Sequence, residues 1–328
     1  MVRSELHIRP LGFEALCRTQ NTQSPEAAVK GACLYLLKTC GITQPPIPLK
    51  PLLAALDISF SWSRSSSHWR PGHGTASLKP VKGRLTVFIH ETLARSNWRR
   101  SRFSVAHEIV HALIIRMLGD SKLIATLDET DDAYNYLERI CNAGAAELLM
   151  PSTMMRTSVK ELGVSPTGLL TLYDRFLVSR EAMIWRIASV IPHASIIRWR
   201  QYARNAEENN CFRVVSCYPP YERESERPWL PEGATTKHLN SDVVERVAQQ
   251  KAPACIDDLE VELSGKVWRC EAAATFFPGR KGNADQPQFE GFPVPDEKAS
   301  SWGTDILVFA AKKQMSTSQM LWGGEQPV

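Results

Sequence analysis

The feature of this sequence that most constrains its fold is an apolar stretch that carries two histidines and a glutamate. Residues 101–118 read SRFSVAHEIVHALIIRML, and the apolar residues lie nearly all round a helix, as in a helix buried in a domain core. Ser101 is the predicted N-cap, and Gly119 marks the predicted end of the helix. Because desolvated polar groups need partners, the imidazoles and the carboxylate of this helix must find them inside the fold.

His107 and His111 are the two imidazoles of this helix, and Glu108 follows the first of them. A helix advances about 100° per residue, so side chains four residues apart project from one face, one turn apart. This spacing allows both imidazoles to bind one divalent metal ion, with Glu108 beside them to act on a metal-bound water. The alternative is a core helix whose histidines form ordinary hydrogen bonds.

A third metal ligand is expected on a second helix, predicted over residues 136–150 and ended by a proline. Its two acids, Glu138 and Glu147, are nine residues apart, which places them on opposite faces. Glu138 shares its face with small or apolar residues and would be buried there, whereas Glu147 is expected to face solvent. Geometry therefore favours Glu138, and the acids of residues 128–132 are the remaining alternatives.

Two separated motifs in this chain resemble those of the ImmA/IrrE family of metallopeptidases. Residues 102–111 read RFSVAHEIVH and residues 138–151 read ERICNAGAAELLMP, where the family reads RF-x-x-AHE-x-GH and then E-x-x-AN-x-FA-x-x-LLMP. Val110 stands where the family usually has Gly, and Cys141 where it commonly has Ala; neither change removes a ligand. The resemblance extends over residues 30–151.

The resemblance implies a zincin-like metallopeptidase domain in which His107, His111 and Glu138 hold the metal. Glu108 is then the catalytic acid/base, which accepts a proton from the attacking water and passes it to the leaving amine. The expected metal is Zn²⁺, and Mn²⁺ or Fe²⁺ suit two imidazoles and a carboxylate almost as well. The implied activity is that of a zinc-dependent endopeptidase.

Four further residues are candidates for supporting roles in this site. Tyr134, His90 and Arg102 are candidates for the second donor to the oxyanion of the reaction. Asn142, or an acidic loop expected before the second helix, is the candidate partner for the free N–H of a ligand imidazole.

The same resemblance implies a protein substrate, a DNA-binding transcriptional repressor cleaved under stress or in response to a mobile element. The layout is similar to that of the radiation-response regulators of the family, whose C-terminal part is GAF-like. The competing function is a helix-turn-helix transcriptional regulator or a partner-binding module in which the metal site is vestigial or structural.

Residues 164–190 follow the pattern of a helix-turn-helix. Eight Lys/Arg stand against three Asp/Glu between residues 151 and 204, which favours an anionic partner, although a solvated face is the commoner meaning of such an excess. The favoured interpretation is a three-helix unit that packs on the peptidase domain, with contact to nucleic acid as the alternative. In that alternative Arg180 and Arg186 are the candidate contacts. The second helix would present five side chains outward: Arg180, Glu181, Met183, Trp185 and Arg186.

The expected fold class is α+β, in three domains followed by a tail. They are a zincin-like peptidase domain with a small sheet over residues 1–152, a helix-turn-helix-like helical segment over 153–194, a GAF-like α+β domain over 195–313, and a disordered tail over 314–328. The peptidase domain is predicted to hold helices at 25–40 and 50–56, strands at 58–62, 74–78 and 84–89, and loops at 63–73 and 122–136. The last domain is predicted to hold strands at 195–202, 211–217, 266–277 and 305–310, and a helix at 241–250.

Composition narrows the classes of protein further. A chain of 328 residues with 43% hydrophobic and 23% charged residues is typical of a soluble globular protein, and its net charge of +4 points to no particular partner. Neither a membrane span nor the apolar core of a signal peptide is found, so a cytoplasmic protein without a membrane partner is expected. The eight cysteines include no C-x-x-C pair, which argues against a cysteine zinc site or a disulfide framework.

Overall fold

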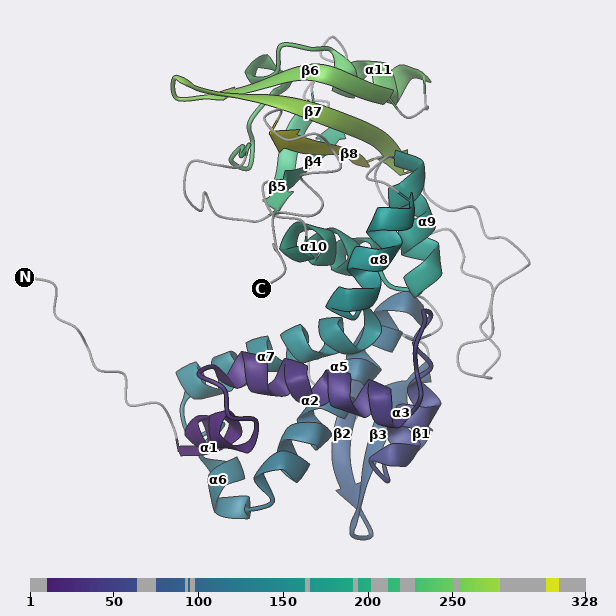
Figure 1. Cartoon of the computed structure of the whole chain (residues 1–328), viewed down its shortest axis with the longest axis vertical. Coiled ribbons are helices and arrows are strands. Elements are labelled where there is room, and N and C mark those ends of the chain that lie inside the picture. The colour runs from purple at the N-terminus through teal and green to yellow at the C-terminus, as the bar shows by residue number, and fades with distance from the viewer. Residues whose placement is uncertain are drawn as a thin grey trace, which may run out of the picture. The chain divides into compact units, whose positions relative to one another are not determined.

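The structure is a computed structural model, and it describes residues 11–63, 75–91, 94, 98–162, 166–190, 194–201, 212–218, 228–250, 254–277 and 305–312. Among these, residues 11–151 and 176–178 form one compact unit, and the other described residues form a second (Figure 1). Across the described ranges, no helix combines the length and the hydropathy needed to span a membrane.

The helix with the two histidines, α5 (Trp98–Leu118), is the centre of the first unit. It begins three residues before the predicted cap, so Ser101 lies inside the helix and is fully buried. It ends where predicted, because Gly119 has a φ of 64°, the left-handed conformation that glycine adopts after a helix. Further helices of this unit are α1 (Leu11–Thr19), α2 (Pro25–Thr39), α3 (Leu49–Ala55), α6 (Ser121–Ala125) and α7 (Asp131–Leu149).

Helix α5 is apolar nearly all round because other elements contact it on several sides. It contacts α7 and α2, which lie beside it in Figure 1, and it also contacts strands β2 and β3. Val105, Ile109 and Leu113, which follow one another one turn apart, are all buried. The packing around α5 therefore restricts the side-chain conformations of the polar residues of the motif.

A glycine of α7 accommodates the valine that departs from the family pattern. A Cβ atom on Gly144 would lie 2.8 Å from Val110 Cγ1 and 2.9 Å from Val29 Cγ1, closer than such atoms approach. The family pattern has Gly at the position of Val110 and Phe at the position of Gly144. At this contact the larger side chain therefore belongs to α5 in this chain and to α7 in the family pattern.

The sheet of the first unit has the strand order β1-β3-β2 among the described residues. β1 (Ser59–Ser63) runs parallel to β3 (Arg84–His90), and β2 (Ala76–Val81) runs antiparallel to it. Lys82 and Gly83, both with positive φ, make the two-residue turn between β2 and β3 that the right-handed twist of a hairpin favours. β2 is thus an edge strand, and the predicted small sheet is confirmed.

The second unit contains the second sheet, with the order β5-β4-β8-β7-β6 and every neighbouring pair antiparallel. Helix α11 packs on one face, over an apolar core that includes Trp199 and Trp268. Helix α10 contacts β4 and β5. The elements are α8 (Ser152–Leu162), α9 (Pro166–Phe176), α10 (Arg180–Val190), β4 (Ala194–Gln201), β5 (Phe212–Tyr218), a 3₁₀ turn (Thr236–His238), α11 (Val243–Gln250), β6 (Ala254–Leu263), β7 (Lys266–Phe277) and β8 (Asp305–Lys312).

The α+β class is confirmed, and several details differ from the sequence-based predictions. The loop predicted over 122–136 is wrong, since α6 and the first turns of α7 occupy most of it. Helix α1 and strand β6 were not predicted, and α8 lies almost wholly within the predicted helical segment of residues 153–194. Glu147 is 2% exposed rather than solvent-facing. The predicted loop at 63–73 lies almost wholly, and the tail at 314–328 wholly, outside the described residues.

The second helix of the helix-turn-helix pattern does not present all the expected side chains outward. Met183 and Arg186 are buried, at 3% and 7% exposed, because this part of α10 packs within its own unit. Trp185 is exposed, and its ring lies 4.7 Å from that of Tyr218 on β5. Arg180 begins α10, and its side chain lies outside the described part.

Candidate metal centre

The side chains of His107, His111 and Glu138 converge between α5 and α7. The Nε2 atoms of the two histidines lie 3.0 Å apart. One carboxylate oxygen of Glu138 lies 3.2 Å from His107 Nε2, and the other lies 3.2 Å from His111 Nε2. The four-residue spacing on α5 brings both imidazoles to one face, and α7 presents the carboxylate to that face. The three residues proposed from the sequence as ligands therefore lie together.

These donor atoms fit a divalent metal ion. In a tetrahedral zinc site with bonds of about 2.0–2.2 Å, neighbouring donors lie about 3.3 Å apart. The separations here are 3.0 and 3.2 Å. His107 Nδ1 donates to Asn142 Oδ1 over 3.0 Å, so in the neutral imidazole Nε2 keeps a lone pair that faces the cluster. The arrangement of the three side chains and the tautomer of His107 both suit a bound cation.

Proton binding holds the same cluster together when no metal is present. Burial lowers the pKa of His107, but its hydrogen bond to Glu138 and the charges of Glu108 and Glu138 outweigh burial, so the pKa is raised above the ordinary imidazole value. Hydrogen bonds from His107 and His111 lower the pKa of Glu138 far below that of an ordinary carboxyl group. His107 therefore keeps its proton to a higher pH than a free imidazole does.

Glu108 is held between the cluster and the sheet. Its Oε2 accepts a hydrogen bond of 2.9 Å from the backbone N–H of Leu78 on β2. Burial raises the pKa of Glu108, and the nearby charges of His111 and His107 lower it by less, so the pKa stays above its ordinary value. A carboxyl group with a raised pKa can both accept and return a proton closer to neutral pH.

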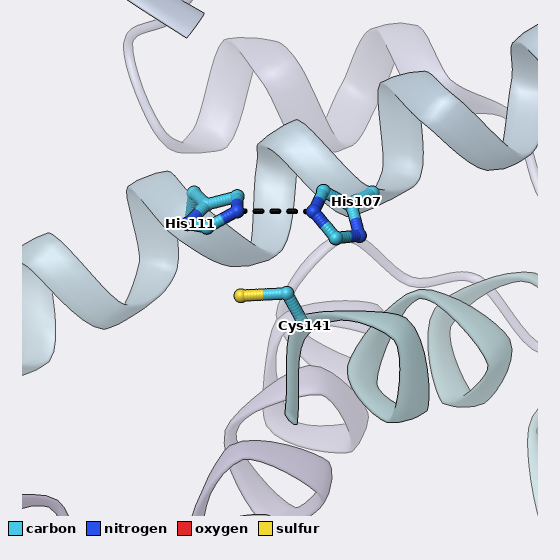
Figure 2. Close-up of side chains that lie close together, drawn as sticks. All are labelled: His107, His111 and Cys141. Atoms are coloured by element: carbon cyan, nitrogen blue, oxygen red, sulfur yellow. Dashed lines mark hydrogen bonds between the residues drawn. The ribbon is translucent and has the colours of Figure 1, made fainter. Parts of the chain in front are cut away.

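A thiol is the fourth potential donor at this cluster. The donor atoms of His107, His111 and Cys141 all lie within 4.8 Å of one another. Figure 2 shows Cys141 on α7 beside the two imidazoles of α5. Burial, followed by the charges of Glu138 and Glu108, raises the pKa of this thiol far above its ordinary value. In the sequence Cys141 stands out only as a departure from the family pattern, although its three-residue spacing from Glu138 places both on one face of α7.

The remaining supporting candidates have different surroundings. Tyr134, one turn before Glu138, hydrogen-bonds to that carboxylate; burial and the charge of Glu138 raise the pKa of Tyr134. Arg102 is buried, and its Nη2 donates to the backbone oxygen of Ile47 over 2.6 Å, so part of its guanidinium braces the segment before α3. His90 ends β3, where its backbone N–H donates to the oxygen of residue 75.

Comparison with known proteins identifies the part of the chain that contains this centre. Residues 69–188 match the IrrE N-terminal-like domain of peptidases. The radiation response metalloprotease IrrE of Deinococcus deserti is 36% identical over 166 residues, which cover 45% of this chain and 58% of the relative. The protein of the same name from Deinococcus radiodurans is 32% identical over 99 residues, 28% of each chain. The chain therefore spans less than two thirds of the length of these relatives.

A solved structure shares the fold. A transcriptional regulator of Mycobacterium tuberculosis superposes with a TM-score of 0.50 at 12% sequence identity, over 97% of this chain and 86% of that one. At this identity the likeness concerns the fold alone. The matched domain and the metalloprotease relatives, together with the two motifs on α5 and α7, support the assignment of residues 69–188 to the ImmA/IrrE family of metallopeptidases.

Proposed function

We propose that this protein is a zinc-dependent endopeptidase. The observation that carries the proposal is the convergence of two imidazoles and one carboxylate, with separations of 3.0 and 3.2 Å, beside the half-buried carboxylate of Glu108 on the helix of the imidazoles. His107, His111 and Glu138 would hold the metal, and three protein ligands leave a position for a reactant, as in catalytic zinc sites. Mn²⁺ and Fe²⁺ are the alternative ions for this set of donors.

A bound divalent metal would polarise the attacking water and the scissile carbonyl group. Glu108 accepts the proton of the attacking water on its carboxylate and returns it to the nitrogen of the leaving amine. The hydrogen bond from Leu78 N–H to Oε2 orients this carboxylate, which leaves Oε1 for the proton. Tyr134, which is 41% exposed and bonded to Glu138, is our candidate for the second donor to the oxyanion.

The edge of β2 is the proposed binding surface for the substrate backbone. The N–H of Leu78 points away from β3, since it donates to Glu108. In an antiparallel pair the backbone groups alternate, so those of Ala76 also point to this edge, while Ser77 and Lys79 pair with β3. Pro80, which has no N–H to offer, faces the same edge, where proline is tolerated. An extended peptide could add here as a further strand beside Glu108.

The natural substrate that we propose is a DNA-binding transcriptional repressor, cleaved in the cytoplasm as part of a stress or mobile-element response. Support comes from the family and from relatives described as radiation response metalloproteases. We further propose that the part of the second unit from β4 to β8 is GAF-like and binds a small ligand or a partner. Its single antiparallel sheet with α11 packed on the core face supports this proposal.

The test is cleavage by the metal-loaded full chain and by two matched variants. Glu108→Gln keeps the size and the hydrogen-bonding capacity of the side chain but cannot accept the proton, so we expect cleavage to fall by about 10²–10⁴-fold while metal binding persists. Glu129→Gln, an exposed acid of the same unit, is the control and should cleave like the wild type.

Two substrates separate the chemistry from the choice of target. A pool of unstructured peptides tests peptidase activity, and a purified repressor encoded near this gene tests the substrate class. Equal cleavage of the peptides by the wild type and Glu108→Gln would reject the mechanism. Cleaved peptides with an intact repressor would reject only the substrate.

A further inference from the structure

We propose that Cys141 is a fourth protein ligand to the metal and closes the site in a latent form of the enzyme. The inference rests on the metal site of the proposed function and concerns a residue that the family pattern does not have. Where the family commonly has Ala, this chain carries a thiol whose sulfur lies within 4.8 Å of a donor nitrogen of both His107 and His111.

The position of Cys141 on α7 supports its role as a ligand. Glu138 and Cys141 are three residues apart, so both side chains lie on the face of α7 that meets α5. The cluster thus receives two donors from α5 at a four-residue spacing and two from α7 at a three-residue spacing. Figure 2 shows three of these side chains, His107, His111 and Cys141. Cys141 is fully buried, so its sulfur faces the protein interior and not bulk solvent.

The chemistry of the donors suits a closed zinc site. Structural zinc sites have four protein ligands drawn from Cys, His and carboxylates, whereas catalytic sites keep one position for water. When Cys141 binds, a metal–sulfur bond forms, the thiol proton passes to solvent water, and the water held in the fourth position leaves. No oxidant or reductant is needed for this exchange.

Closure of the site would make the resting enzyme latent. The thiolate occupies the position that the attacking water needs, so Glu108 has no water from which to take a proton. Dissociation of the sulfur from the metal would open the site again. Replacement by Ala, the residue of the family pattern, would leave the enzyme permanently open.

The experiment measures the coordination of cobalt by the full chain. Metal-free wild type, Cys141→Ala and Cys33→Ala are each loaded with one equivalent of Co²⁺, and binding is checked by elemental analysis. Cys33→Ala is the matched control, since Cys33 is also a buried thiol, on α2, and is outside the group formed by the two imidazoles. The readout is the near-ultraviolet absorption band from charge transfer between thiolate and cobalt, which does not depend on activity.

We expect the band in the wild type and in Cys33→Ala and its loss in Cys141→Ala, together with a higher kcat/KM for peptides in Cys141→Ala. Stoichiometric cobalt without the band in the wild type would overturn the proposal, as would a band that persists in Cys141→Ala. An unchanged kcat/KM after loss of the band would overturn the latent form. A failure of the proposed peptidase function would appear separately, as no cleavage by any of the three proteins while the band still reports the ligand.

Discussion

Glu138 and His107 attract each other in the metal-free protein, and this attraction makes the free energy of unfolding depend on pH. The pKa of Glu138 is lowered, so its stabilising contribution is present above the pKa of an unfolded carboxyl group and is lost only in strong acid. The pKa of His107 is raised, so its contribution is complete below the ordinary imidazole pKa of about 6.5 and is lost as the pH rises through the raised value.

Metal binding should have the opposite dependence on pH, because it requires the neutral imidazole. We therefore expect the increase in Tm on adding Zn²⁺ to be small at about pH 6 and larger at about pH 8. Thermal unfolding of chelator-treated and zinc-loaded protein across this range measures the difference. A difference in Tm that does not grow with pH would contradict the assigned pair.

Asn142 fixes the orientation and the tautomer of His107 through its Oδ1. Asn142→Ala removes the acceptor, and we expect the affinity for Zn²⁺ to fall by about 10–100-fold. Asn142→Asp keeps an acceptor at the same position and should retain most of the affinity. Competition with a zinc chelator measures both variants; an Asn142→Ala protein that binds zinc as tightly as the wild type would refute this role.

At the residue scale, helix geometry placed the two imidazoles together and favoured Glu138 as the third donor, with the acids of residues 128–132 as the alternatives. Two imidazoles four residues apart and a carboxylate on a small-residue face could be deduced from helix geometry. The burial of Glu147 could not be deduced in this way, because it depends on which elements pack against the far side of α7. Spacing within one helix carries no such information. The role of Cys141 was hidden for a related reason: a lone cysteine becomes a candidate ligand only when a second helix brings donors to it.

The exchange of bulk between Val110 and Gly144 couples α5 to α7 at the element scale. Gly144→Ala would place a methyl group 2.8 Å from Val110 Cγ1, so we expect it to destabilise the wild type by about 1–3 kcal/mol. In a Val110→Ala background the same change should cost less, because the valine methyl groups are gone. Denaturant unfolding of the four proteins of this double-mutant cycle measures the coupling. Additive effects would show that the two positions do not share the contact.

Helices and strands could be predicted where nearby residues alone determine them. They were missed where the same local sequence is compatible with two structures. The acidic run before α7 was taken for a loop, yet Asp131 and Asp132 form the first helical turn, where acids interact favourably with the helix dipole. Thr130 caps this turn by accepting a hydrogen bond from Ala133 N–H. Strand β6 escaped prediction because its register against β7 is broken between Ile256 and Leu259.

On the scale of the whole molecule, the helices after residue 151 belong with the second sheet. Arg186 is 7% exposed, so we expect Arg186→Ala to destabilise the protein by about 1–3 kcal/mol through lost packing. Lys237→Ala, an exposed cation of the same unit, is the control and should have little effect. Chemical unfolding measures stability, and a DNA titration at low and high salt detects any nucleic-acid contact. A variant of normal stability that loses salt-dependent DNA binding would restore the helix-turn-helix interpretation.

The class of fold could be predicted from the alternation of helical and strand patterns, but the placement of α10 could not. A helix-turn-helix that reads DNA and a helical segment that packs on a sheet have the same spacing of apolar residues. The difference lies in the burial of Met183 and Arg186, on a helix that contacts strands β4 and β5.

The orientation of Leu78 has a consequence for the targets that this protein could cut. An edge strand that binds only the backbone of a substrate does not select most of its side chains. It does require several consecutive substrate residues in an extended conformation. A substrate segment within a helix or a closed sheet cannot bind in this way without local unfolding. Cleavage should therefore be concentrated in hinges and interdomain linkers of the substrate. Selectivity between substrates would come from contacts outside the cleaved segment.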